Sequence, residues 1–134
     1  MTDSGAVTCV SPANVAEKLA SDDAKEWLII DVRDEDRRIG WLPQTVHLPS
    51  ATLSVPIMEK FITQHTKPTI PAAFVFHCMH SQQRAVRAAN LCQDVVHSML
   101  QRHLLNSAGV VPKILIMSGG YAKYHVLFPD RVQK

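Results

Sequence analysis

Short apolar runs alternate with longer amphipathic segments along this chain. Residues 27–32 and 73–77 are mostly apolar stretches bounded by polar residues, a pattern typical of strands that are covered on both faces. Residues 45–48 and 113–117 are further stretches of the same kind, so the pattern predicts four strands. The charged segment at residues 33–38 is expected to form a surface loop.

The segments between these runs predict helices. Ser11 followed by Pro12 has the sequence of an N-cap with proline in the first turn, and predicts a helix to about residue 20. Residues 54–65 predict a second helix, and residues 84–105 predict the longest one. The apolar residues of this longest segment recur at helical spacing: Ala88, Leu91, Cys92, Val95, Val96, Met99 and Leu104.

The order of these elements predicts the fold class. A turn at Gly119-Gly120 starts a last helix that ends near residue 129. Strands that alternate with helices imply an α/β fold, a doubly wound and mostly parallel sheet with helices on both faces. We expect one domain over residues 11–134, preceded by an N-terminal arm at residues 1–10. In such folds ligands bind beyond the carboxyl ends of the strands.

Composition narrows the class of protein. The chain has 134 residues, of which 46% are hydrophobic and 19% charged, so we expect a globular protein. The net charge of +2 gives no reason to expect nucleic acid or a membrane surface as a partner. Residues 1–66 hold ten acidic and six basic residues, whereas residues 67–134 hold two acidic and eight basic ones. We therefore expect the second half to bind an anion.

Three cysteines, Cys9, Cys78 and Cys92, are too few and odd in number for a disulfide framework. The sequence shows no basic segment followed by an apolar run at its start, and no apolar stretch of membrane-spanning length. We expect a cytoplasmic protein with free thiols, in which Cys92 belongs to the core and Cys9 is mobile. The seven histidines show no metal-ligand spacing with the cysteines, so no metal site is predicted.

The turn after the strand at residues 73–77 carries the candidate chemistry. Cys78 stands at the carboxyl end of that strand, and the amides of residues 79–84 can converge on one centre as the chain enters the long helix. The positive field of the helix N-terminus favours a negatively charged sulfur, so we expect Cys78 to be a thiolate nucleophile. Arg84 is unfavourable in a first helical turn unless its guanidinium binds an oxyanion. The alternative is that Cys78 is an ordinary core residue and Arg84 is solvated.

These residues resemble a known family. Five residues separate Cys78 from Arg84, which is the cysteine-phosphatase signature, and the loop lies between Ile-Asp-Val-Arg at residues 30–33 and Ser-Gly-Gly-Tyr at residues 118–121. Over residues 11–130 the chain is similar to rhodanese-fold phosphatases of the cell-division-cycle type, and especially to their small eukaryotic relatives that reduce arsenate and antimonate. The resemblance implies a rhodanese-like domain with Cys78 as nucleophile. A tetrahedral oxyanion would be held by the Arg84 side chain and the loop amides, those of Met79, His80, Ser81, Gln82, Gln83 and Arg84.

The chain departs from that family at three places. Met79 stands where the cell-cycle phosphatases carry glutamate, Val32 where they carry a second cysteine, and Ala85-Val86 where Gly-Pro or Ala-Pro is usual. Without the second cysteine the reductant is expected to be external, glutathione alone or with glutaredoxin, and no tightly bound cofactor is expected. Rhodanese sulfurtransferases generally have a loop shorter by one residue, whereas this loop leaves room for phosphate or arsenate.

Several residues near the loop are expected to support it. The resemblance and the chemistry both favour a structural ion pair between Asp31 and Arg33 beneath the loop. His77 would hold the loop by hydrogen bonding rather than transfer protons. His80 is expected at the rim, with proton donation as the alternative, and Ser81 would steady the thiolate through its hydroxyl.

Three functions from different classes are compatible with the sequence. The first is an arsenate reductase that could also take antimonate, using the Cys78 loop and an external thiol. The second is a phosphatase that acts through a cysteinyl-phosphate, for which Asp34, Glu35 or Asp36 would have to supply a general acid. The third is a non-catalytic rhodanese-like module that binds an anion or a partner protein. Sulfurtransferase activity ranks last because of the loop length.

Overall fold

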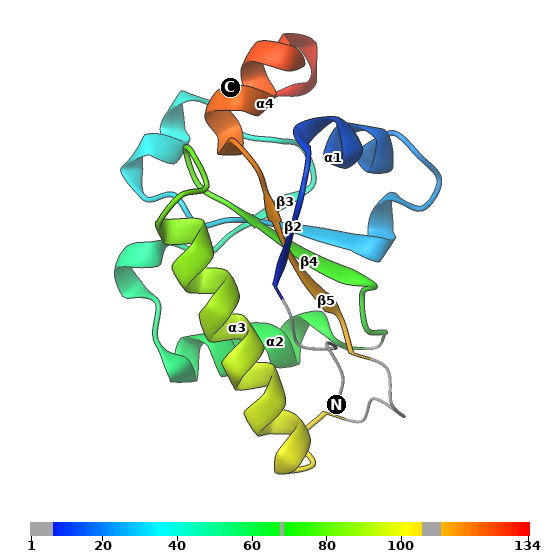
Figure 1. The fold of residues 1–134 in the computed structure, drawn as a ribbon, viewed down its shortest axis with the longest axis vertical. Helices are drawn as coiled ribbons and strands as arrows, with labels where there is room; N and C mark the ends of the chain where they lie inside the picture. Colours follow the sequence, from blue (N-terminus) through cyan, green and yellow to red (C-terminus); the bar gives the residue numbers. More distant parts are fainter. Residues whose placement is uncertain (1–6, 68, 106–110) are drawn as a thin grey trace.

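The computed structural model of the protein describes residues 7–67, 69–105 and 111–134. Five strands form one sheet in the order β1-β5-β4-β2-β3, and each neighbouring pair is parallel (Figure 1). The strands are β1 Thr8–Val10, β2 Trp27–Asp31, β3 Thr45–His47, β4 Ala73–His77 and β5 Lys113–Met117. β4 is central and buried along its whole length. The predicted α/β fold with a mostly parallel sheet is confirmed.

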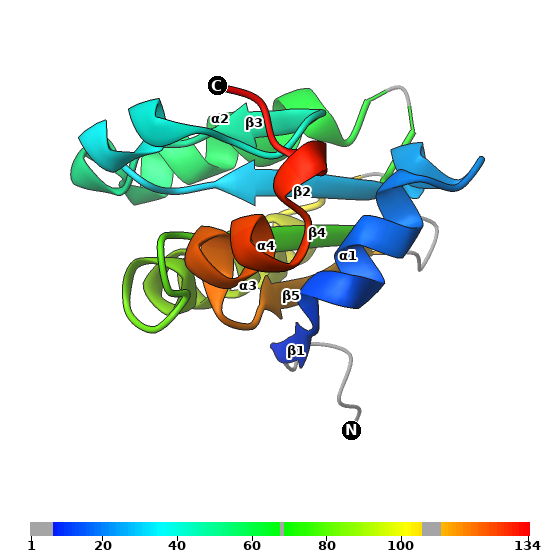
Figure 2. The same cartoon turned by 90° about the horizontal axis from the view of Figure 1, so that it is seen from above.

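Helices cover both faces of this sheet. The α-helices are α1 Pro12–Leu19, α2 Val55–His65, α3 Arg84–Gln101 and α4 Gly120–Leu127, and the short 3₁₀ helices are η1 Ala24–Glu26, η2 Glu35–Ile39, η3 Ser50–Thr52 and η4 Pro129–Arg131. As Figure 2 shows, α1 and α4 lie together on one face, while α2 and α3 pack on the other. Alternate residues of β4 pack into the two hydrophobic cores on opposite faces of the sheet. Phe74 and Phe76 face α2 and α3, whereas Val75 faces α1 and α4. Within the described part of the chain, no helix combines the length and apolar character needed to cross a membrane.

Local sequence accounts for where two helices begin. The Ser11 hydroxyl accepts a hydrogen bond from the Asn14 amide at 3.0 Å, and the Ser54 hydroxyl accepts one from the Ile57 amide at 3.3 Å. In both helices a proline follows in the first turn, where its missing N–H leaves no intrahelical bond unmade. The helix starts predicted from the sequence at these positions are confirmed.

The predicted N-terminal arm differs from the structure at its end. Thr8–Val10 forms the edge strand β1, in which Cys9 pairs with Ile116 of β5. The first two residues of β1 are exposed, so the hydrophobic pattern of the sequence gives no sign of this strand. Residues 1–6 of the expected arm lie outside the described residues.

The long helix is shorter than its apolar pattern predicts. It ends at Gln101 rather than near residue 105, and Leu104 is half exposed. His103 adopts a left-handed φ of 58°, and the amides of His103 and Leu104 bond back to carbonyls of the last turn. This is a Schellman motif, which usually has glycine at the left-handed position. Because histidine occupies that position here, the sequence does not predict the end of the helix.

An ion pair is buried where β2 ends. Of the expected surface loop at residues 33–38, only Arg33 is buried, and the half-buried or exposed remainder forms the 3₁₀ helix η2 from Glu35. Asp31 and Arg33 are both fully buried, with Arg33 Nη2 2.8 Å from Asp31 Oδ2 and Nε 3.0 Å from Oδ1. Arg33 Nη2 also donates to the Gly40 carbonyl at 2.6 Å, and the guanidinium lies 4.2 Å from the centre of the Tyr121 ring. The pair therefore connects β2, the turn around η2 and α4.

The first turn of α4 packs against the loop that joins β4 to α3. The Tyr121 amide donates to the Cys78 carbonyl at 3.0 Å, and the Ala122 amide donates to the Met79 carbonyl at 2.8 Å. Gly120 permits this approach, because a Cβ there would lie 2.5 Å from both carbonyl oxygens. Its φ of +61° is also a conformation that strains any residue with a side chain. The position of the loop therefore depends on α4.

We predict that Asp31→Asn lowers the free energy of unfolding by about 3–5 kcal/mol, because it leaves the Arg33 charge buried without a partner. Burial raises the pKa of Asp31, but the hydrogen bonds from Arg33 and the nearby positive charges together lower it more, so the pKa lies below its ordinary value. This stabilisation is present above the unfolded-state pKa of about 3.9 and is lost as the pH falls through the lower folded value. Urea denaturation of the wild-type protein and the variant, at neutral pH and across the acidic range, measures the loss of stability and its dependence on pH.

The control for this variant is Asp94→Asn, which removes an exposed carboxylate from α3 and should change the free energy of unfolding by less than about 0.5 kcal/mol. If Asp31→Asn is as stable as the wild-type protein at neutral pH, the ion pair does not hold this end of the sheet together.

Gly120→Ala is expected to destabilise the protein by about 1–3 kcal/mol and to displace the loop after β4. Gly119→Ala is a matched control, because Gly119 has a positive φ of 78° but the atoms nearest its added Cβ belong to the Lys123 side chain. Both variants should unfold at lower urea concentration, and only Gly120→Ala should change the rate at which iodoacetamide alkylates Cys78. An unchanged rate in Gly120→Ala would show that the loop does not depend on this approach.

Candidate active site

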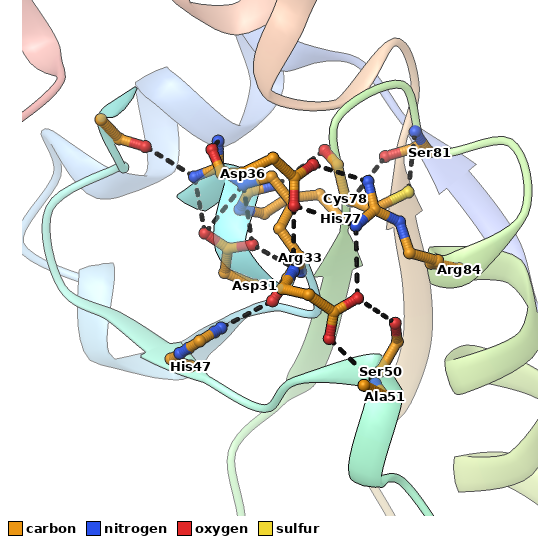
Figure 3. A network of polar contacts seen from close by, with 12 residues as sticks. Asp31, Arg33, Asp36, His47, Ser50, Ala51, His77, Cys78, Ser81 and Arg84 are labelled. Carbon is orange, nitrogen blue, oxygen red and sulfur yellow. Dashed lines mark hydrogen bonds and ion pairs between the residues drawn. The ribbon is translucent and has the colours of Figure 1, made fainter. Parts of the chain in front are cut away.

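Cys78 follows β4 directly, and only 3% of its surface is exposed. Its sulfur accepts a hydrogen bond from the Ser81 amide at 3.2 Å, while its own amide donates to the Ser81 hydroxyl at 3.4 Å (Figure 3). Ser81 has a left-handed φ of 57°, which turns the loop back toward the sulfur. The sequence predicts a contact of the Ser81 hydroxyl with the sulfur, whereas in the structure the Ser81 amide makes that contact and the hydroxyl accepts from the Cys78 amide.

The peptide groups at the start of the loop have a fixed orientation. Their carbonyls, those of Cys78 and Met79, are bound by the first turn of α4. In a planar trans peptide the N–H points opposite to the C=O, so the amides of Met79 and His80 point away from α4. Two of the amides that the sequence assigns to anion binding are therefore turned away from the helix and remain available as donors.

A cavity of about 280 Å³ lies beside the loop. It is lined by Cys78, His80, Gln82, Gln83 and Arg84. Cys78 is among the residues that line this cavity in spite of its low exposure. Met79 is not among the residues that line the cavity, and its side chain packs instead against the core that α1 and α4 cover.

Arg84 opens α3 and binds two carboxylates in addition to lining the cavity. Its Nη1 and Nη2 lie 3.0 and 2.7 Å from the two carboxylate oxygens of Asp36, and Nη1 lies 3.4 Å from Asp34 Oδ2. The hydrogen bonds to Asp36 raise the pKa of Arg84 above its ordinary value, so the guanidinium keeps its charge. The sequence predicts an oxyanion as the partner of Arg84 and does not predict these two carboxylates.

Parallel pairing explains why these residues meet. β2 and β4 are neighbours, and Asp31 pairs with His77. The turn at residues 34–36, which we call the acidic turn, and the Cys78 loop therefore follow adjacent strand ends. Of the acids considered as general acids, Asp34 and Asp36 reach Arg84. Glu35 is exposed and has no hydrogen bond or ion pair with any other described residue. The contact of Arg84 with the two carboxylates could not be predicted, because it depends on the strand order, which the sequence does not give.

Two histidines belong to the site in different ways. His80 lines the cavity, whereas His77 is fully buried with Nδ1 3.2 Å from the Cys78 carbonyl oxygen. Because a carbonyl only accepts, Nδ1 carries the proton of the His77 ring. Burial lowers the pKa of His77, which favours the neutral ring; its role in holding the loop stays a prediction. Among residues 7–67, 69–105 and 111–134, no three His, Cys, Asp or Glu side chains gather closely enough to hold a metal ion.

The other two cysteines are not placed to form a disulfide with Cys78. Cys9 pairs with Ile116, which pairs with Phe76, so Cys9 and Phe76 are two strand spacings, about 10 Å, apart. Cys92 lies in the core, more than two turns into α3, and burial raises its pKa well above the ordinary value. A disulfide needs Cα atoms within about 7 Å of each other, so either pairing would require the backbone to move.

Solved structures of the same architecture include proteins of both predicted classes. The As-Sb reductase from Leishmania major is 25% identical with a TM-score of 0.77, and the match covers 93% of this chain and 81% of the reductase chain. Ygr203w from Saccharomyces cerevisiae, described as a homologue of single-domain rhodanese and the Cdc25 phosphatase catalytic domain, is 19% identical with a TM-score of 0.68 over 96% of this chain and 88% of its own. A second structure of Ygr203w, described as a yeast protein tyrosine phosphatase of the rhodanese family, gives 18% identity and a TM-score of 0.68 over 97% and 90% of the two chains.

The likeness to Ygr203w concerns the fold alone, because the identity is low. No curated protein matches the chain in sequence. The rhodanese-like domain family, in contrast, matches residues 11–126, a span that includes Cys78, Arg84 and the first turn of α4. This chain therefore belongs to the rhodanese-like domain family.

Proposed function

We propose that the protein is an arsenate reductase, with antimonate as a second substrate, and that Cys78 is its nucleophile. The observation that carries the proposal is the environment of the Cys78 sulfur, which borders a cavity, receives the Ser81 amide and lies beside the charged Arg84. The five loop residues between Cys78 and Arg84 leave room for a tetrahedral oxyanion. The likeness to the As-Sb reductase supports arsenate and antimonate as the oxyanions.

The proposed reaction has two steps. First the Cys78 thiolate attacks arsenic, a sulfur–arsenic bond forms, and one arsenic–oxygen bond breaks as that oxygen takes protons from solvent and leaves as water. Arg84 and the amides of Met79 and His80 stabilise the negative charge on the remaining oxygens. A glutathione thiolate then attacks the Cys78 sulfur, and the electron pair of the sulfur–arsenic bond stays on arsenic, which departs as arsenite. A second thiol, from glutathione or glutaredoxin, reduces the mixed disulfide and restores Cys78.

An external thiol is proposed because neither of the other cysteines is placed to resolve the Cys78 intermediate. Cys9 is on the edge strand β1, and Cys92 is buried in the core near the middle of α3. Glutathione and glutaredoxin act where thiols are kept reduced, so we place the reaction in the cytoplasm. The chain would then need no tightly bound cofactor.

A phosphatase is the second candidate, since the same cavity can hold phosphate. Its leaving group needs a general acid, and the two acids at Arg84 are poorly suited to that role. Hydrogen bonds from Arg84 lower the pKa of Asp36. Burial raises the pKa of Asp34, but hydrogen bonds from Ser50, Ala51 and Arg84, together with the charge of Arg84, lower it more. Both acids are ionised at neutral pH. Arsenate oxygens exchange protons with water, so arsenate reduction does not require such an acid.

Incubation of the protein with arsenate, glutathione and glutaredoxin tests the proposal, with arsenite as the measured product. We expect arsenite from the wild-type protein and none above background from Cys78→Ser. Cys9→Ser, which changes an exposed thiol on β1, should keep the wild-type rate. No arsenite from the wild-type protein would contradict the proposal. If Cys78 were also no more reactive than a free thiol, a non-catalytic module would be preferred.

Arg84→Lys is expected to lower kcat/KM for arsenate by about 10²–10³-fold, because lysine cannot bind an oxyanion through two nitrogens. Arg87→Lys is the matched control, since Arg87 is exposed in the same first part of α3 and should leave kcat/KM unchanged. Equal losses in the two variants would mean that the effect is not specific to Arg84, which would contradict its proposed contact with the oxyanion.

The phosphatase is tested with an aryl phosphate across a range of pH. Because Asp34 and Asp36 are ionised, we expect slow hydrolysis whose rate does not depend on a protonated acid in the neutral range. A fast reaction with a clear loss of rate as an acid deprotonates, together with no arsenite from arsenate, would instead identify the protein as a phosphatase.

A further inference from the structure

The two edges of the Arg84 guanidinium are used differently. Both Nη atoms bind the Asp36 carboxylate, at 3.0 and 2.7 Å, and Nη1 also reaches Asp34 (Figure 3). Nε has no hydrogen-bond partner within the described part of the chain. A guanidinium carries five N–H donors in a planar fork, so the edge formed by Nε and the second Nη2 hydrogen can bind an oxyanion while Asp36 keeps the other edge.

The carboxylates at Arg84 are held in place by other groups as well. Ser50 Oγ donates to Asp34 Oδ2 at 2.7 Å, and the Ala51 amide donates to Asp34 Oδ1 at 2.9 Å. Asp36 Oδ1 accepts the Asp34 amide at 3.0 Å, and Arg33 Nη1 lies 3.4 Å from the Asp36 carbonyl oxygen. The acidic turn is therefore built from β2, η2 and η3, and its carboxylates stay near Arg84 when Arg84 binds a ligand.

An oxyanion that approaches Arg84 meets one positive charge and two negative ones. Arg84 stays protonated, while Asp34 and Asp36 have pKa values below their ordinary range and are ionised at neutral and mildly acidic pH. Like charges a few ångströms apart repel, and the repulsion grows with each further charge on the ligand. A ligand that carries a proton has less charge and can also donate that proton to a carboxylate in a hydrogen bond.

We propose that Asp36 determines which oxyanions the Cys78 loop accepts, and that it favours protonated monoanions over dianions such as sulfate. This inference rests on the proposed function, because it takes the loop as an oxyanion site, and it narrows the substrate class to singly charged oxyanions such as dihydrogen arsenate. Asp36 is a positioning and specificity residue in this proposal, since it acts through Arg84 and through charge. Phosphate esters in their dianionic form would be poor ligands for the same reason.

Protection of Cys78 from the uncharged reagent iodoacetamide measures the binding of each anion. The experiment uses the Cys9→Ser protein, because Cys9 is exposed and would otherwise react, while Cys92 is buried. Phosphate and sulfate are compared at one mildly acidic pH, where phosphate is mainly a monoanion and sulfate is a dianion. His80, which also lines the cavity, is present in every variant, so it does not affect the comparison between variants at that pH.

We expect phosphate to protect Cys78 better than sulfate in the protein with Asp36 intact, and to lose this advantage as the pH rises and phosphate becomes a dianion. Asp36→Asn should shift the ratio of the two dissociation constants by about tenfold in favour of sulfate. Asp36→Glu, which keeps the charge, should restore the original preference. Glu35→Gln removes the same charge from the neighbouring position without a contact to Arg84, and should leave the ratio unchanged.

The other outcomes are distinguishable. If both anions bind more tightly to Asp36→Asn by the same factor, Asp36 only competes with them for Arg84. If both bind more weakly by the same factor, Asp36 only orients the Arg84 side chain. Either result would overturn the selectivity proposal. A wild-type preference for sulfate would overturn it without any variant. If neither anion protects Cys78 while the protein is folded, the oxyanion site is wrong, and the proposed function fails together with this inference.

Discussion

The orientation of the loop after β4 depends on two of its carbonyl groups, which the first turn of α4 binds. The first-turn amides of α4 bind the Cys78 and Met79 carbonyls, and peptide planarity then directs the Met79 and His80 amides to the other side. Donors that are aligned before a ligand arrives stabilise negative charge without reorganisation, which is the main way in which enzymes stabilise oxyanions. The arrangement depends on Gly120, because a side chain there would meet both carbonyl oxygens.

The buried pair of Asp31 and Arg33 connects the acidic turn after β2 with α4, the helix whose first turn binds this loop. Arg33 bonds to Asp31 and to the carbonyls of Asp36 and Gly40, and so fixes the turn that brings Asp36 to Arg84. The acidic first half of the chain thus supplies carboxylates to the basic second half at the site. Charge distribution along the sequence predicts an anion for the second half. The structure shows that part of the positive charge, that of Arg84, is already paired with Asp34 and Asp36 within the chain.

The sequence predicts most of the fold and the centre of the site because both depend on local features. The apolar residues of β4 indicate a buried strand wherever the chain places it, and Cys78 and Arg84 belong to one loop. The contact between Arg84 and Asp36 joins residues that are 48 positions apart, and it follows from the pairing of β2 with β4. β1 has three residues, two of them exposed, so its pairing with β5 leaves no apolar pattern. The end of α3 was missed because His103 takes a position at which glycine is the usual signal.

A crystal structure of the Cys78→Ser variant with arsenate tests the central claim most directly. We expect the anion in the cavity beside residue 78, with hydrogen bonds from the amides of Met79 and His80 and from the Arg84 guanidinium. The carbonyls of residues 78 and 79 should remain bound to the first turn of α4. Arsenate bound elsewhere on the molecule, or loop amides that point away from the cavity, would contradict the proposed oxyanion site.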